Sequence, residues 1–257
     1  MSDLFNEEII SQATHTKWAG KTVHFARETD STNLWGKRAW REEGAGHGEL
    51  FVAEYQSAGR GRFTRRWSAP PDSAITMSIL ICPEFSPQKA PMLTLVMGLS
   101  VAQAVAEFGF EVGIKWPNDV VVSRKKICGI LTEMTMKQDK IGCAVIGVGI
   151  NVNMESFPEE MADKATSLYL ESGHPFDRAQ VVGLVMKHFE ENYERFVQTE
   201  DLSGLKQPVR VLDQNDPYEG IARGINAGGE LLVERADGTV EEVNSGEVSV
   251  RGLYSYV

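Results

Sequence analysis

Cysteine is scarce in this sequence, and its few copies lie far apart. The 257 residues include three cysteines, Cys82, Cys128 and Cys143, and no two of them form a C-x-x-C pair. A zinc site or a redox dithiol needs closely paired cysteines, and a His-Glu-x-x-His motif is absent too, so a resident metal site is not expected. An odd number of thiols fits a reducing compartment, and we expect a cytoplasmic protein.

The sequence also shows no pattern of a leader peptide, and it has no uninterrupted apolar run. Its first ten residues, MSDLFNEEII, contain no basic region followed by an apolar stretch, so a signal peptide is not expected. The longest apolar stretch, residues 93–110, is interrupted by Ser100, Gln103 and Glu107. Such a segment predicts a poor membrane span, and no membrane partner is expected.

Positive charge is in deficit. The chain has 26 lysines and arginines against 36 acidic residues, a formal net charge of -10 and a pI near 5.1. Such a field repels the phosphate backbone of nucleic acids, so no nucleic-acid partner is expected. With 42% hydrophobic residues the chain can bury a sizeable core, and its length fits one large domain or an ordinary domain with a small appendage.

The first part of the chain predicts alternating helices and strands. The tetrapeptide DSTN at 30–33 supplies helix-capping side chains, and residues 34–43 continue with good helix formers. Residues 57–72 are rich in Gly, Arg, Ser and Pro and predict a long loop, which is a common place for function. Strands are predicted at 49–55 and 74–82, and a buried helix is predicted at 91–108.

A series of strands separated by short polar turns follows. The predicted strands are residues 112–116, 120–122, 127–136 and 141–150, with SRKK and KQDK as turns. Consecutive strands joined in this way predict a mainly antiparallel sheet. Residues 176–196 have the apolar spacing of an amphipathic helix that covers it.

The pattern changes near residue 208. Short strands with the sequences PVRVL, GIARGI, ELLVER, TVEEV and EVSVR alternate with the turns NAGG, ADG and NSG, which predicts a small β-barrel. We therefore expect an α+β protein with a larger domain at 1–206 and a β-barrel domain at 207–257. No helix-turn-helix pattern precedes the first predicted strand.

Four arginines stand together in the predicted loop. The segment GRGRFTRRW at 59–67 contains Arg60, Arg62, Arg65 and Arg66 in an otherwise acidic chain. Guanidinium groups bind carboxylates and phosphates with two prongs, the glycines let the backbone approach a ligand, and the tryptophan can stack on a flat ring. A solvated basic turn or an RNA-binding Arg-Gly segment is the alternative, although the overall acidity favours a site for a small anion.

A second polar segment is KWPND at 115–119, followed by Lys126. Trp, Pro, Asn and Asp together have low strand propensity, so the segment predicts a fixed polar corner, although Pro-Asn-Asp is also an ordinary turn sequence.

Two glycine-containing segments fail as nucleotide motifs. Gly147-Val148-Gly149 lacks the third glycine of a dinucleotide fingerprint, because residue 152 is valine. Residues 20–22, GKT, lack the leading glycine of a phosphate loop, because residue 15 is histidine.

Taken together, the motifs ETDSTN, AEYQSAGRGRFTRRW, KWPND, RKKICGIL and VIGVGINVN resemble the biotin–protein ligases. The resemblance spans residues 25–257, and the segments EGIARGI and SGEVSVR are similar to the SH3-like domain of that family. It implies a mixed, mainly antiparallel sheet flanked by helices, the class II synthetase-like biotin/lipoate ligase fold. It also implies that 1–206 is the catalytic domain, in a short form without an N-terminal DNA-binding domain.

The resemblance implies that ATP converts biotin to biotinyl-5'-AMP and that biotin then passes to a lysine of a biotin carboxyl carrier protein. The biotin-binding residues that it implies are Ser31, Thr32, Asn33, Gln56, Arg60, Gly61, Arg62, Lys126 and Gly129. The ATP-binding residues that it implies are Gly59, Arg62, Arg65, Trp67, Asn118, Lys126, Asn151 and Arg251. Arg62, Asp119 and Lys126 are the expected catalytic residues.

The chemistry requires cations, because the carboxylate and the α-phosphate repel each other. Arg60, Arg62, Arg65 and Lys126 are expected to neutralise that charge, with Mg²⁺ accompanying ATP. Asp119 is the candidate that accepts the proton of the acceptor lysine or only orients its amine. A lipoate– or octanoate–protein ligase and a non-enzymatic anion-binding module are the alternatives, and a homodimer is left open. The central Phe63-Thr64 departs from the small or basic residues that the family often carries.

Overall fold

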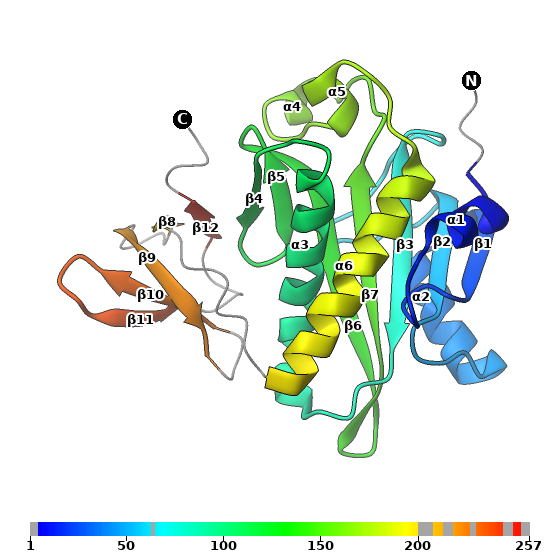
Figure 1. Cartoon of the computed structure of the whole chain (residues 1–257), viewed down its shortest axis with the longest axis horizontal. Helices are drawn as coiled ribbons and strands as arrows, with labels where there is room; N and C mark the ends of the chain where they lie inside the picture. Colours follow the sequence, from blue (N-terminus) through cyan, green and yellow to red (C-terminus); the bar gives the residue numbers. More distant parts are fainter. Residues whose placement is uncertain are drawn as a thin grey trace.

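The computed structural model describes two β-sheets of unequal size. It covers residues 5–62, 65–199, 208–212, 218–226, 230–243 and 249–252. The larger sheet has seven strands and the smaller has five. In Figure 1 the smaller sheet lies beside the larger one, next to β4 and α3.

The larger sheet has the strand order β1-β2-β3-β7-β6-β5-β4. The strands are β1 (Val23–Thr29), β2 (Leu50–Gln56), β3 (Ala74–Ile81), β4 (Val112–Lys115), β5 (Asp119–Val122), β6 (Lys125–Lys137) and β7 (Lys140–Asn151). β4 to β7 form an antiparallel meander, as the sequence predicts. β1 was not among the predicted strands, and its parallel pairing with β2 makes the sheet mixed.

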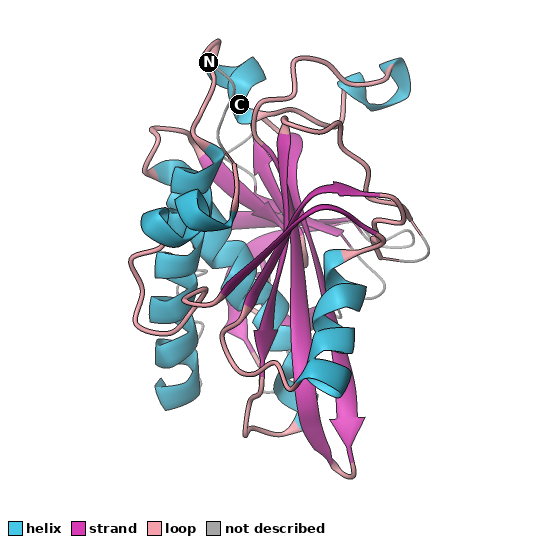
Figure 2. Cartoon of the chain, turned by 90° about the vertical axis from the view of Figure 1, so that its right-hand side faces the viewer, coloured by secondary structure: helices cyan, strands magenta, loops and turns pink. Residues whose placement is uncertain are grey.

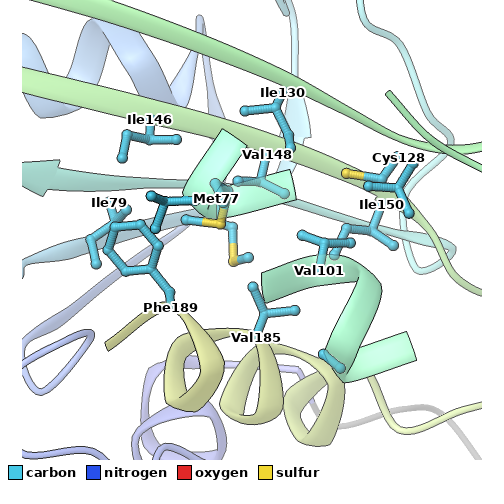
Figure 3. Packing of buried hydrophobic residues seen from close by; sticks show 14 of the residues in the cluster. Met77, Ile79, Val101, Cys128, Ile130, Ile146, Val148, Ile150, Val185 and Phe189 are labelled. Atoms are coloured by element: carbon cyan, nitrogen blue, oxygen red, sulfur yellow. The ribbon is translucent and has the colours of Figure 1, made fainter. Parts of the chain in front are cut away.

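One face of this sheet is covered by two long helices, α3 (Ala90–Ala106) and α6 (Arg178–Thr199), which pack against each other (Figure 1). Alternate side chains of the central strands point toward them, and Figure 3 shows Met77 and Val148 between the sheet and Phe189 of α6. The short helix α1 (Glu7–Ala13) packs beside α6.

The α3 segment differs from its sequence interpretation as a poor membrane span. By length and composition alone, residues 87–106 are long and apolar enough to cross a bilayer. In this fold, however, most of that stretch is buried, because α3 packs against both β6 and α6.

The opposite face carries one helical segment, so helices flank the twisted sheet on both sides (Figure 2). The segment consists of α2 (Thr32–Arg38), which continues as a π-helical turn, η1 (Ala39–Glu43). It ends at Gly44, whose φ of 78° is left-handed and favours glycine. A small second core packs beneath it around Phe51, Leu80 and Val145.

Four short helical elements were not predicted from the sequence. They are α1, η2 (Pro87–Lys89), α4 (Glu159–Ala162) and α5 (Leu168–Ser172). The last two lie in the connection from β7 to α6 and form the top of the molecule in Figure 1.

The smaller sheet is antiparallel throughout, with the order β11-β10-β9-β8-β12. Its strands are β8 (Pro208–Leu212), β9 (Tyr218–Ile225), β10 (Leu231–Arg235), β11 (Val240–Val243) and β12 (Ser249–Gly252). All five coincide with predicted strands. That the sheet closes as an SH3-like barrel stays a prediction, and the predicted boundary at 206/207 lies outside the described residues.

Candidate active site

Glycines form a flat floor on the sheet face that α3 and α6 do not cover. Thr76 of β3 pairs with Gly149 of β7, which pairs with Gly129 of β6, and Gly129 pairs with Asp119 of β5. Figure 3 shows Val148 and Ile150 on the opposite, helical face, so the intervening Gly149 faces this floor. Glycine inside a strand often marks a close approach of another group, and here two occur side by side.

Trp67 lies on this floor. A Cβ atom added to Gly149 would stand 2.2 Å from Cε2 of the indole, and one added to Gly129 would stand 3.3 Å from Cζ3. β7 therefore needs glycine where the ring rests, and a Cβ atom at Gly129 would make a tight contact with the ring. Within the described part of the chain, the buried indole Nε1 of Trp67 has no hydrogen-bond partner.

The arginine loop folds back on itself to place this tryptophan. The Trp67 N–H donates to the Gly59 carbonyl at 3.1 Å, and the Gly61 N–H donates to the Arg65 carbonyl at 2.8 Å. A Cβ atom at Gly59 would lie 2.3 Å from the Trp67 carbonyl oxygen, so this close approach requires glycine. Phe63 and Thr64, at which the sequence departs from the family, lie outside the described residues.

Arg62 reaches from the loop to the polar corner of KWPND. Its Nη1 donates to Oδ1 of Asn118 at 2.9 Å. Asn118 is itself fixed, since its Nδ2 donates to the Ile130 carbonyl at 3.2 Å and its carbonyl accepts from the Ile130 N–H at 2.9 Å. Burial lowers the pKa of Arg62, the charge of Asp119 opposes that effect, and the charge of Arg65 adds to it. A bound anion would relieve both unfavourable effects.

Lys126 and Asp119 form an ion pair at the edge of the floor. The Lys126 Nζ lies 2.7 Å from Oδ1 of Asp119, and their side chains are 33% and 18% exposed. Among the described residues, Oδ1 has no donor at a hydrogen-bonding angle, so the contact is electrostatic rather than a directed hydrogen bond. The same Nζ lies 5.9 Å from the centroid of the Trp67 ring. A cation, a carboxylate and an aromatic ring therefore meet here.

Asn151 holds the backbone of Lys126. Its buried Nδ2 donates to the Lys126 carbonyl at 3.4 Å and to the Thr166 carbonyl at 3.0 Å. The Lys126 N–H in turn donates to the Lys164 carbonyl at 2.8 Å. The amide group of Asn151 thus fixes the start of β6 beside the floor.

The other end of the floor is lined by neutral polar groups. Here Ser78 of β3 pairs with Gly147 of β7, and a Cβ atom at Gly147 would stand 2.1 Å from Oδ1 of Asn33. Ser78 Oγ lies 2.7 Å from both Asn33 Oδ1 and Thr32 Oγ1. Gln56 Oε1 accepts from the Thr32 N–H at 2.8 Å. These neutral donors and acceptors are joined in one network.

Ser31 is buried at the N-cap of α2, yet its hydroxyl makes no capping hydrogen bond. The helix-cap reading of this side chain, which the sequence allowed, therefore does not account for its burial. Gln56 instead receives the N–H of the next residue, Thr32.

The remaining arginines differ in their surroundings. Arg60 and Arg66 are both exposed, but Arg60 Nη1 lies 3.1 Å from Oε1 of Glu133, whereas Arg66 Nη2 donates to the Ser57 carbonyl at a long 3.4 Å. Arg65 is exposed as well. The backbone of Arg251 pairs with Arg210 in the smaller sheet, but the predicted ATP contact of its side chain lies outside the described residues.

A cavity of about 260 Å³ adjoins the Arg62–Asn118 pair. It lies between the first turns of α3 and residues 130–134 of β6, and Trp116 forms part of its wall. Trp116 is 5% exposed, and its Nε1 has no partner among the residues described. The described residues contain no group of three or more His, Cys, Asp or Glu side chains that could hold a metal ion.

Sequence reasoning missed Ser78, Glu133 and the role of Gly147 and Gly149. The two glycines were tested against a dinucleotide fingerprint alone, although glycine in an apolar strand was itself a signal of close approach. Ser78 and Glu133 carried no local signal, because their partners are 45 and 100 residues away in the chain.

Comparisons with known proteins agree with this geometry. Residues 25–151 match the biotin/lipoate A/B protein ligase family, and residues 204–251 match the biotin protein ligase C terminal domain. The bifunctional ligase/repressor BirA of Bacillus spizizenii is 37% identical over 220 residues, which cover 80% of this chain and 67% of that protein. The biotin–[acetyl-CoA-carboxylase] ligase of Mycobacterium tuberculosis is 32% identical over 219 residues, 78% of each.

Solved structures give the same result. The biotin protein ligase from Aquifex aeolicus in complex with biotin and ATP is 33% identical and superposes with a TM-score of 0.70. The match covers 90% of this chain and 99% of that one, so the larger domain and the C-terminal segment are both included. With two family matches, relatives above 30% identity and a shared fold, this chain belongs to the biotin protein ligase family.

Proposed function

We propose that this chain is a biotin–protein ligase that forms biotinyl-5'-AMP and pyrophosphate from biotin and ATP, and then transfers biotin to a lysine of a biotin carboxyl carrier protein. The observation that carries this proposal is the division of the glycine floor. Neutral donors and acceptors stand at the Gly147 end, and cations stand at the Asp119 end. Biotin has the matching form, with a neutral ureido head and a carboxylate at the end of an apolar chain.

The neutral end would bind the ureido group. Thr32, Asn33 and Gln56 already form a network there, and Ser31 is buried beside it. A ureido group has two N–H donors and one carbonyl acceptor, which neutral hydroxyl and amide groups can match without a charge. Glycine at 147 and 149 lets Asn33 and Trp67 lie close against the sheet on this face.

The cationic end would bind the carboxylate and the phosphates. The attack of the carboxylate on the α-phosphate brings two anions together, and fixed cations lower that barrier. Arg62 and Lys126 stand at the floor, and the exposed Arg65 adds charge from the loop. Trp67, Asn118, Asn151 and the side chain of Arg251 are proposed for the nucleotide side.

Magnesium would enter with ATP. No protein-built site for it is assigned, because the described residues contain no suitable cluster of acidic side chains. No role of the residues above depends on the position of the ion.

In the second step the amine of the carrier lysine attacks the mixed anhydride and AMP leaves. An ordinary lysine has a pKa of ~10.4, so only about one in a thousand is neutral at pH 7. Asp119 is proposed to orient this amine or to accept its proton, and Lys126 beside it holds the carboxylate in place. A cytoplasmic location and a homodimer are proposals of the same kind.

The direct test combines purified chain, biotin, MgATP and a biotin carboxyl carrier domain. We expect biotin on the carrier lysine, detected by mass spectrometry, and one pyrophosphate released per transfer. Lipoate and octanoate in parallel reactions test the alternative acyl substrates, and neither should be transferred at a comparable rate. No biotin transfer to a carrier that another ligase modifies would contradict the proposal.

A further inference from the structure

A partly buried carboxylate next to the floor collects donors from two separate segments. Glu133 of β6 accepts from Asn33 Nδ2 at 2.9 Å and from Lys37 Nζ at 3.0 Å, both of which belong to α2. Arg60 Nη1 of the arginine loop lies 3.1 Å from the same carboxylate. Glu133 therefore joins the sheet, the helix and the loop at a single point.

The charge of this carboxylate is stabilised by its neighbours. Burial raises the pKa of Glu133, but hydrogen bonds from Asn33 and Lys37 and the charges of Lys37 and Arg60 outweigh burial and lower it. Its side chain is 18% exposed, whereas that of Arg60 is 44% exposed. The less exposed partner is thus the carboxylate, which can fix an exposed loop residue.

The same carboxylate sets the orientation of the Asn33 amide. With Nδ2 donating to Glu133 and to the Leu131 carbonyl at 3.1 Å, Oδ1 must face Ser78, which lies 2.7 Å away. From Ser78 the network continues to Thr32. One chain of hydrogen bonds thus runs from Glu133 to the neutral end of the floor.

We infer that Glu133 is a positioning residue of the biotin site, which fixes the Asn33 amide on one side and Arg60 on the other. It does not touch the reacting atoms, because it lies in the row beyond Leu131, at the end of the floor away from Asp119. Its loss should weaken biotin binding and leave the chemical step nearly unchanged. This inference rests on the proposed function.

The test measures adenylate formation by the full chain for Glu133→Gln. The amide keeps the size of the side chain but turns an N–H₂ group toward the donors of Asn33, Lys37 and Arg60. We expect the KM for biotin to rise about tenfold, which corresponds to the loss of one charge-assisted hydrogen bond. The kcat and the KM for ATP should stay within about twofold. Asp139→Asn, the same kind of change in the exposed β6–β7 turn, is the control and should match the unaltered chain.

Two more variants make the test specific. Glu133→Asp keeps the charge but shortens the side chain, so its KM for biotin should lie between those of the unaltered chain and Glu133→Gln. In an Arg60→Ala background, Glu133→Gln should raise the KM for biotin by a smaller factor than it does alone, because part of its effect passes through Arg60.

The possible outcomes distinguish the proposed function from the positioning role of Glu133. If the unaltered chain forms no adenylate, the proposed function fails. If the unaltered chain is active and folded Glu133→Gln and Glu133→Asp both keep its KM for biotin, or if kcat falls alone, the positioning role is overturned. Circular dichroism establishes that each variant is folded, and if Glu133→Gln does not fold, the Asp variant decides.

Discussion

The indole of Trp67 rests directly on the α-carbon of Gly149, so that a single methyl group there would stand 2.2 Å from the ring. Non-bonded carbon atoms prefer about 3.5–4.0 Å, so the ring and a side chain cannot share this place. The contact joins the arginine loop to the centre of the sheet.

Gly149→Ala should therefore displace Trp67, which is proposed for the nucleotide side, and weaken ATP binding by about tenfold or more, a loss of ~1.4 kcal/mol or more. Titration followed by tryptophan fluorescence measures it. Gly98→Ala is the matched control, because its new methyl group would lie an ordinary 3.6 Å from Ile130. That control should leave binding unchanged and stabilise the helix by up to about 1 kcal/mol. Equal affinity for Gly149→Ala and the unaltered chain would refute the role of the floor.

Arg60→Ala should weaken retention of biotin or of the adenylate far more than Arg66→Ala. Both side chains are exposed, but Arg60 forms an ion pair with Glu133, whereas Arg66 makes one long hydrogen bond to the Ser57 carbonyl. Both changes remove one positive charge from the same loop, so a general electrostatic effect would lower both affinities alike. A binding titration that gives equal losses would count against this division.

Lys126→Ala should slow adenylate formation by about a hundredfold, which is typical for the loss of one fixed group that stabilises developing charge. It also leaves Asp119 without its cation. Lys140→Ala removes an equal charge from the exposed start of β7 and serves as the control. The readout is pyrophosphate release, and an unchanged rate in Lys126→Ala would contradict the assignment.

Asp30 should make the free energy of unfolding depend on pH in acidic solution. Two hydrogen bonds from Arg38 lower the pKa of Asp30 from 3.8 to about 2, against the effect of burial. Because the folded pKa is the lower one, the stabilisation is present above about pH 4 and is lost as the pH falls from there toward 2. Both side chains are about 40% exposed, so solvent screening keeps the gain below about 1 kcal/mol. Asp30→Asn should flatten urea-unfolding stability over that range and match the unaltered chain near pH 2.

Arg178 should be important for stability. It is fully buried at the start of α6, where Nη1 contacts Glu54 at 2.6 Å and the guanidinium lies 4.2 Å from the Phe5 ring centroid. Arg178→Met leaves Glu54 buried without its partner and should lower the free energy of unfolding by about 3–5 kcal/mol. Adding Glu54→Gln to that variant should recover part of the loss. Urea titrations of both variants decide this, and additive losses would argue against a coupled pair.

Most of the strands and long helices were predictable, because their periodicity and bounding turns are local. β1 was missed because its sequence, VHFARET, is that of a half-exposed edge strand with little alternation. The π-helical turn at 39–43 could not be read from propensity, since its residues are ordinary helix formers.

The site was only partly predictable. The residues themselves indicated an anion site at the arginine loop, and resemblance connected that loop to DSTN, KWPND and Lys126. The structure brings Arg62 to Asn118 and Lys126 to Asp119 and Trp67. The contact between Asn33 and Glu133 depends on strand register and helix placement, which no local pattern encodes.

The two faces of the large sheet have separate roles. The face under α3 and α6 is packed with aliphatic side chains, and the reverse face carries the glycine floor. Successive residues of one strand are therefore under different structural constraints. Replacing Val148 by a similar apolar residue should change stability alone, whereas any side chain at Gly149 would collide with Trp67. A directed-evolution library that randomises only the helical face should thus improve thermal tolerance without altering what the enzyme accepts.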